Sequence, residues 1–283
     1  MTANLALLRP TGIPRAVRRA ATGVPPTVLL AALVLVGVLL WSVAPGVFTS
    51  FDPVTGNTAE KLLAPSAAHW FGTDYLGRDL FARVVYGTAS SVTSALVAVL
   101  IGLVLGSAIG LASGFLRGWV DTVLGRVVDV LLAIPGFLLA VVIVSSLGFQ
   151  TINAAIATGV SAIAVFARLM RAETLRARGS VFVEASYLQG GNRLHALLRH
   201  VLPNAYRSVV ALAVLQFGTS ILVIASLAFL GYGDPPPASD WGLLVASGKA
   251  YATAPWLVYA PALVIVATVL SVNRISNWMR KAK

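Results

Sequence analysis

Long apolar stretches separated by short polar ones dominate the chain. A helix that crosses a bilayer needs about 20 mostly apolar residues, and each of the long uncharged stretches reaches this length. The stretch at 130–167 is too long for one helix, and Gly148, Gln150 and Asn153 near its middle predict a turn that splits it in two. The pattern therefore predicts an all-α polytopic membrane protein with six transmembrane helices, drawn from 24–51, 84–116, 130–167, 208–233 and 250–273.

The low charge of the chain agrees with burial in lipid. Only 11% of the residues are charged and 58% are hydrophobic, with a mean hydropathy of +0.86, whereas a soluble domain carries about 25% charged residues. A net charge of +11 would suggest nucleic acid for a soluble protein, but in a membrane protein it reports topology. We therefore expect membrane lipid and no nucleic acid as a partner, and the absence of cysteine excludes disulfides and thiolate metal sites.

The distribution of basic residues orients the six spans. An even number of spans puts both termini on one side, and most of the 21 basic residues then fall on that side. Because cytoplasmic loops carry an excess of Lys and Arg, both termini are expected in the cytosol. The inner set is Arg9, Arg15, Arg18, Arg19, Arg117, Arg126, the arginines from Arg168 to Arg207, Arg274, Arg280, Lys281 and Lys283, and the outer set is Lys61, Arg78, Arg83 and Lys249.

The first span needs to be distinguished from a signal peptide. It follows a group of arginines, and the "SVA" at 42–44 resembles a cleavage site. Pro45 would follow the cut and the apolar run is long for a signal, so an uncleaved helix is expected. The segments 49–86 and 232–255 are expected outside, because both mix Gly, Pro, Asp and aromatic residues as loops and interfacial helices do.

Two features within the spans bear on helix packing. Pro135 is expected to kink the third span. In the second span, four glycines recur every four residues, which aligns them along one helix face and lets a neighbouring backbone come close. Tight packing within one subunit is favoured over a face that slides during transport. The glycines are Gly102, Gly106, Gly110 and Gly114.

Ion-coupled or catalytic chemistry has little support in the sequence. Asp129 is the one acidic residue predicted within a span, near its inner end, and pairing with Arg126 or another nearby arginine explains it better than ion coupling does. The three histidines fall on different sides of the membrane and cannot form one metal site. The stretch "GLLVASGKA" at 242–250 fails the spacing of a phosphate-binding loop. The chain is therefore predicted to be non-catalytic, with no cofactor or metal of its own.

The longest polar interruption lies at 168–207, between the fourth and fifth spans. A short helix is expected to begin after Ser180, a candidate N-cap, and to break at Gly190 and Gly191. A second short helix follows, and Pro203 stops it or begins the next span. Two such amphipathic helices can lie on the membrane surface or fill a groove in a partner protein. The second helix is expected to present one apolar face made of Leu194, Leu197, Leu198 and Val201.

The stretch "EASYLQG" followed by "HVLP" resembles the EAA motif of bacterial ABC importer permeases. That motif runs Glu-Ala-Ala, three residues, Gly, nine residues, an often aliphatic position, one residue, then Leu-Pro. Ser186 replaces the third residue of the motif and His200 occupies the often aliphatic position. The residues that match at the motif spacing are Glu184, Ala185, Gly190, Leu202 and Pro203.

Three further segments are similar to the C-type subunit of dipeptide and oligopeptide permeases. "GTDYLGRDLFARVVYG" is similar to the GTDxxGRD segment of that subunit, and "RGWVDTVLGRVVDVLLAIPGFLL" resembles its third helix and the loop before it. "LAFLGYGDPPPASDWG" resembles its FLGxGxxPPxxxWG segment. With the EAA motif, these segments cover nearly the whole chain from about residue 25 onward, although the family often continues past the last helix and this chain stops at Lys283.

The resemblance implies the type I ABC importer permease fold and a permease subunit that forms half of the translocation pathway for di- or oligopeptides. It implies as partners a homologous B-type permease, two ABC ATPase subunits that bind ATP and magnesium, and an extracytoplasmic peptide-binding protein, with the chain in the bacterial inner membrane. In this family the EAA segment is the coupling helix, which sits in a groove on an ATPase. Its implied contact residues are Glu184, Ala185, Ser186, Gly190, Arg193, His200, Leu202 and Pro203.

Other cargoes and other classes of protein stay open at this point. Nickel, glutathione or another small solute can replace peptide within the importer family. An ion-coupled secondary transporter would show inverted repeats or ionisable residues at mid-membrane depth, and a membrane scaffold would need no transport partners. The chain is divided into an N-terminal cytosolic segment with the first span and external loop (1–85), a core of five spans with coupling helices at about 180–203 (86–277), and a cytosolic tail (278–283).

Overall fold

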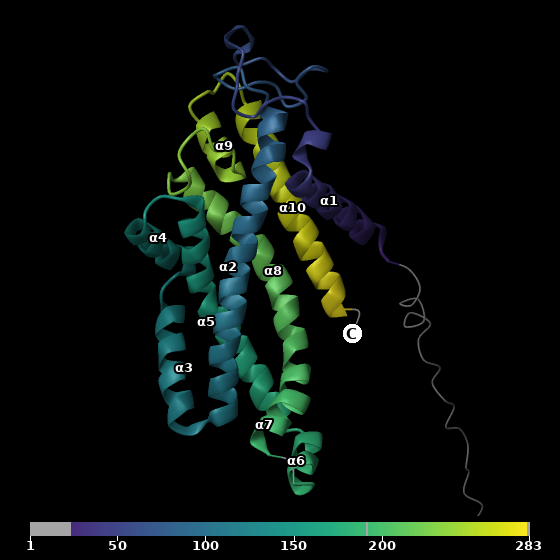
Figure 1. The fold of residues 1–283 in the computed structure, drawn as a ribbon, viewed down its shortest axis with the longest axis vertical. Coiled ribbons are helices and arrows are strands. Elements are labelled where there is room, and N and C mark those ends of the chain that lie inside the picture. The colour runs from purple at the N-terminus through teal and green to yellow at the C-terminus, as the bar shows by residue number, and fades with distance from the viewer. Residues whose placement is uncertain (1–23, 191, 282–283) are drawn as a thin grey trace, which may run out of the picture.

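The computed structural model describes residues 24–190 and 192–281, and these form an elongated bundle of helices joined by loops (Figure 1). The segment between α5 (Thr151–Arg178) and α8 (Leu202–Phe229) lies at one end of the bundle. The opposite end contains α9 (Trp241–Gly248) and the loop before α2 (Leu80–Leu116). The basic residues Arg9, Arg15, Arg18, Arg19 and Lys283, together with Gly191, lie outside the described residues.

In the part of the chain that the structure describes, five long helices are apolar enough to cross a membrane. The third predicted span is instead a pair of helices, and counting the pair as one span gives the expected six. The turn predicted near residue 150 is confirmed, because one helix ends at Leu147 and the next begins at Thr151. The five long helices are α1 (Pro26–Val43), α2 (Leu80–Leu116), α5 (Thr151–Arg178), α8 (Leu202–Phe229) and α10 (Trp256–Lys281).

The third span is broken rather than merely kinked. It consists of α3 (Gly118–Ala133) and α4 (Gly136–Leu147), whose axes are bent by 92°. Pro135 lies at the break, where its missing N–H and its ring prevent the helix from continuing. The third span was expected to start at residue 130, but α3 begins at Gly118. The charged residues before position 130 lie on one side of this helix and do not end it.

The boundaries of the later spans also differ from those expected. The helix that contains α8 is continuous from Arg193, and so it extends well before residue 208, where the fifth span was expected to begin. The sixth begins at Trp256 rather than at residue 250, because the short helix α9 (Trp241–Gly248) and a turn occupy the preceding segment. At its other end α10 continues to Lys281.

Glycines allow α2 and α5 to lie in direct backbone contact. A Cβ added to Gly106 would lie 2.5 Å from the carbonyl oxygen of Ile163, and one added to Gly110 would lie 2.3 Å from that of Ala167. Gly102 and Gly114 face α5 in the same way, and on α5 Gly159 faces α2. All of these positions are buried. The glycine face therefore lies against a helix of the same chain.

A buried ionic network anchors the loop before α2 to the start of that helix. The Asp74 carboxylate accepts hydrogen bonds from Arg78 Nε at 2.7 Å and from Arg83 Nη1 at 2.9 Å. Arg83 also donates to the carbonyl oxygen of Ala238 at 2.8 Å, which joins two segments far apart in the sequence. Asp79 caps α2 by accepting from the amide of Ala82 at 2.7 Å. The aspartate and arginines of this network thus fix the end of the bundle that carries α9.

Asp240 begins α9 and makes the stability of this end depend on pH. Its carboxylate accepts the amide of Leu243 at 3.1 Å, while its second oxygen is buried without a partner among the described residues. Burial raises the pKa of Asp240, so the protonated form is favoured in the folded state and stability falls as pH rises from the unfolded-state pKa to the raised one.

We therefore expect Asp240→Asn to remove this loss of stability, because asparagine keeps the capping oxygen without the charge. Asp240→Ala should cost about 1 kcal/mol through loss of the cap. Thermal unfolding of both variants in detergent across acidic to neutral pH checks this, and a pH dependence unchanged in Asp240→Asn would contradict it.

Candidate functional site

The segment from residue 179 to residue 204 joins α5 to α8 and begins with the short helix α6 (Val181–Leu188). The Ser180 carbonyl accepts the amides of Val183 at 3.0 Å and Glu184 at 3.3 Å, so the backbone starts the helix. Ser180 was expected as a candidate N-cap, and its backbone carbonyl takes that position. Its hydroxyl donates back to the Ala177 carbonyl at the end of α5, which also accepts the Ser180 amide.

The break after α6 depends on a glycine. Gly190 has a φ of +84°, a conformation that other residues rarely adopt. Asn192 then caps α7 (Arg193–Ala196), because its side-chain oxygen accepts the amide of His195 at 2.7 Å.

The second short helix was expected to be separate from the fifth span, but the two form one continuous helix. The π-helix η4 (Leu197–Val201) connects α7 directly to α8, and the amide of Leu202 bonds the carbonyl of Leu197. Pro203 lacks an N–H and its ring crowds the preceding turn, and a wider π-turn accommodates both effects. Pro203 was expected to stop the short helix or to begin the next span; it lies in the first turn of α8 and does not interrupt the helix.

The side chains of the second short helix divide between inward and exposed positions. Val201 is fully buried and Leu197 is half-buried, but Leu194 and Leu198 are 61% and 55% exposed. Of the four residues predicted to share an apolar face, Val201 and Leu197 therefore pack inward while Leu194 and Leu198 stay exposed. Ala196 joins them in these inward contacts.

A small apolar cluster holds this segment against the ends of α2 and α5. Val183 from α6 and Val201 from η4 are fully buried beside Phe115 and Ala177. Arg178 reinforces the contact: its Nη1 donates to the carbonyl oxygen of Phe115 at 2.6 Å, and its guanidinium lies 5.7 Å from the centre of the Phe115 ring. The segment is thus packed on the bundle rather than suspended from it.

The opposite side of the segment is open and combines apolar with charged groups. Val181 is 80% exposed and Leu188 is 85% exposed, which is unusual for side chains of this type. Of the predicted site residues, Ser186 is buried and Ala185, His200 and Leu202 are half-buried. The exposed ones are Glu184, Gly190, Arg193 and Pro203.

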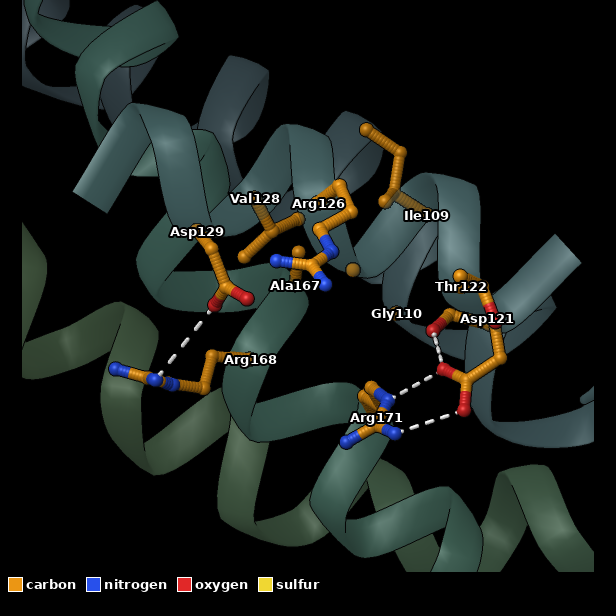
Figure 2. A pocket seen from close by; sticks show the side chains of 12 residues that line it. Ile109, Gly110, Asp121, Thr122, Arg126, Val128, Asp129, Ala167, Arg168 and Arg171 are labelled. Carbon is orange, nitrogen blue, oxygen red and sulfur yellow. Dashed lines mark hydrogen bonds and ion pairs between the residues drawn. The ribbon is translucent and has the colours of Figure 1, made fainter. Parts of the chain in front are cut away.

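A second polar site, between α3 and α5, was only partly expected. Asp129 pairs with an arginine, as predicted, and the partner is Arg168 at 3.8 Å. A stronger pair was missed: Asp121 accepts from Arg171 Nε at 2.6 Å and Nη2 at 2.8 Å, as Figure 2 shows. Its position two helical turns before Asp129 would have indicated the shared face, had the helix been expected to start at residue 118.

Comparison with known proteins adds to this picture. The family described as "Binding-protein-dependent transport system inner membrane component" matches residues 102–282. The dipeptide transport system permease protein DppC of Alkalihalophilus pseudofirmus is 35% identical over 255 residues, which cover 90% of this chain and 84% of that protein. The glutathione transport system permease protein GsiD of Escherichia coli is 41% identical over 219 residues, covering 77% of this chain and 72% of that protein.

Solved structures show the same fold. The MetNI methionine ABC transporter in inward-facing conformations aligns with a TM-score of 0.59 at 17% identity, covering 71% of this chain and 95% of that one. An amino acid ABC transporter aligns with a TM-score of 0.55 at 18% identity, covering 70% and 94%. Fold, motif and sequence agree, and the chain belongs to the family of inner-membrane permease components of binding-protein-dependent ABC importers.

Proposed function

We propose that this chain forms half of the translocation pathway for di- or oligopeptides. Permeases of this family act with a second permease, with ATPases and with a binding protein, and they are normally non-catalytic. The similarity to a dipeptide permease along 90% of the chain supports peptide as cargo. The expected partners are a homologous B-type permease, two ATPase subunits that carry ATP and magnesium, and an extracytoplasmic peptide-binding protein.

The exposed side of the 179–204 segment is the observation that carries the proposed mechanism. It presents Val181, Leu188 and Leu194 together with Glu184 and Arg193, a mixture of anchors and charges that suits a protein groove. An ATPase groove is the proposed occupant of this side. The orientation follows, with the segment in the cytosol and the loop before α2 outside, as the excess of basic residues supports.

The attachment of the segment supports its use as a lever. α6 follows α5 after a two-residue turn, and α7 continues into α8 through η4 without a break. Val183, Ala196 and Val201 are fully buried, so the two short helices are locked to the bundle. A displacement imposed by ATPase closure would therefore move α5 and α8 directly, and through the α2–α5 backbone contact it would move α2.

Glutathione is a second candidate cargo. The glutathione permease relatives are 41% identical over the part that aligns, and glutathione is itself a small peptide. Uptake of labelled dipeptides, longer oligopeptides and glutathione by cells that carry or lack the gene separates the two cargoes. Loss of glutathione uptake alone would replace the peptide assignment.

Variants of the segment test coupling to the ATPase. Glu184→Lys reverses an exposed charge and Gly190→Trp adds bulk at an open position, so we expect each to reduce uptake by about tenfold or more while the assembled complex still inserts and hydrolyses ATP. Uptake and ATP hydrolysis are measured together in proteoliposomes that contain the whole transporter.

Matched changes separate docking from local folding. Gly190→Ala strains the same backbone without the bulk, since Gly190 has a positive φ, and should lose less uptake than Gly190→Trp. Glu60→Lys makes the same charge reversal on the external loop and should leave coupling intact. Normal uptake by both Glu184→Lys and Gly190→Trp would rule out docking through this face.

A further inference from the structure

A polar cavity of about 440 Å³ opens between α2, α3 and α5 (Figure 2). It lies at the same end of the bundle as α6 and α7, where α2 ends and α3 begins (Figure 1). Gly110 from α2 and Ala167 from α5 form its floor with small residues, which leaves room for a ligand. Nothing in the proposed transport mechanism uses this cavity.

The charged groups around the cavity are unevenly paired. Asp121 and Arg171 form a bidentate ion pair, with Ser113 donating a further hydrogen bond to Asp121, so both charges are satisfied. Asp129 and Arg168 approach only to 3.8 Å, and both side chains are largely exposed. No hydrogen bond or ion pair joins the Arg126 side chain to another described residue, and this side chain lines the cavity (Figure 2).

These charges leave the cavity positive. Its lining contains three arginines and two aspartates, and one aspartate is fully engaged by Arg171. Arg126 and Arg168, from α3 and α5, therefore face a single loosely held carboxylate, Asp129. A guanidinium presents a planar fork of donors that matches the oxygens of a phosphate. The unsatisfied donors thus fit a ligand with one negative charge.

The surroundings of the cavity are apolar on the outer side of α3. Val123, Val127 and Val130 are 52%, 50% and 64% exposed, although α3 belongs to a membrane-spanning pair. Trp119, at the start of α3, is 78% exposed, and tryptophan is enriched at the membrane interface. A charged cavity therefore adjoins a surface suited to hydrocarbon chains.

We propose that Arg126 and Arg168 bind the phosphate of an anionic phospholipid headgroup in this cavity, with the acyl chains along the exposed valines of α3. Basic cavities between transmembrane helices near the cytoplasmic surface are suited to such headgroups. Free phosphate shares the headgroup chemistry but has no acyl chains to contact the adjoining apolar surface. This difference favours the lipid. The bound headgroup would hold α3 against α5 at the coupling end of the bundle.

The test measures lipid retention by the full chain, together with any partner subunits that co-purify. The protein in mild detergent is titrated with phosphatidylglycerol or with phosphatidylcholine, and bound lipid is counted by native mass spectrometry. Arg126→Ala and Arg168→Ala should each lower phosphatidylglycerol affinity about fivefold, the factor expected per arginine near an anionic headgroup. Asp129→Asn should raise it, because the competing carboxylate is removed.

Controls distinguish this site from general attraction and from misfolding. Arg176→Ala removes an exposed arginine of α5 that does not line the cavity and should leave retention unchanged. Because Asp129→Asn is expected to act in the opposite direction to the arginine variants, loss of folding cannot mimic the full pattern. Equal retention of both lipids, or equal effects of Arg126→Ala and Arg176→Ala, would overturn the proposal.

A final arm separates the two sources of phosphate. Inorganic phosphate alone is added to lipid-depleted protein, and its effect on thermal stability is compared between the wild type and Arg126→Ala. Arg126-dependent stabilisation by phosphate without selective retention of phosphatidylglycerol would overturn the assignment to lipid. Selective, Arg126-dependent retention of phosphatidylglycerol in the presence of excess phosphate would support it.

Discussion

Gly106→Leu is expected to destabilise the protein by about 3 kcal/mol, because α2 and α5 leave no space for a side chain at this position. A Cβ there would lie 2.5 Å from the Ile163 carbonyl oxygen and 2.6 Å from the Phe166 Cβ, so the helices must separate. The contact continues along the whole glycine face, so local adjustment cannot relieve it. The measurement is the unfolding midpoint and the yield of monodisperse protein in detergent.

Gly37→Leu is the matched control for this prediction. Gly37 also lies within a span, in α1, but a Cβ there would have no atom within 4 Å. The same substitution should therefore leave the unfolding midpoint nearly unchanged. Equal stability of the two variants would mean that the glycine face is not a packing requirement.

Asp74→Ala is expected to have an equal or larger effect at the end of the bundle that carries α9. The substitution leaves Arg78 and Arg83 buried without their carboxylate, and breaking a buried pair in this way costs about 3 to 5 kcal/mol. Because Arg83 also donates a hydrogen bond to the Ala238 carbonyl, the segment before α9 should loosen together with the loop before α2. Hydrogen exchange of both segments measures the change.

Asp52→Ala tests whether the burial of the network matters. Asp52 is an exposed carboxylate of the same external segment, and it accepts only local hydrogen bonds from Val54 and Thr55. Its removal should leave the exchange rates near Arg83 and Ala238 unchanged. Faster exchange in Asp52→Ala than in Asp74→Ala would contradict the anchoring role of the network.

Hydropathy predicted the spans because every helix that crosses lipid must be mostly apolar over about 20 residues. The uncharged stretch at 84–116 corresponds closely to α2, and the polar residues near 150 mark a true turn. Glycine spacing also carried structural information, since four glycines on one face predict a close neighbour. The sequence did not identify α5 as that neighbour, because spacing specifies a face and not what covers it.

The features that were missed depend on three-dimensional context. The start of α3 was misplaced because Asp121 and Arg126 resemble a loop in a hydropathy pattern, whereas α5 supplies Arg171 to satisfy Asp121. The π-turn before Pro203 was missed because periodicity analysis assumes a regular helix. The Asp74 network could not be predicted either, because the Ala238 carbonyl that accepts from Arg83 lies far along the chain.

The Phe182, His195 and His200 rings show how the motif departures are accommodated. His200 occupies the often aliphatic position of the EAA motif, and its ring lies 6.0 Å from Phe182 and 5.9 Å from His195. Ser186, the other departure, is buried in α6. Both side chains therefore contribute to the internal packing of the segment, while Glu184 and Arg193 stay exposed for a partner.

Cross-linking between this chain and its ATPase tests the central claim most directly. The chain has no cysteine, so single cysteines can be placed at exposed positions such as Arg193 and Leu188, with partner cysteines in the ATPase groove. The account predicts disulfide cross-links at these positions whose yield changes when ATP is bound, and none from Ser50 on the external segment. Cross-links absent throughout 184–203 in an assembled, active transporter would contradict it.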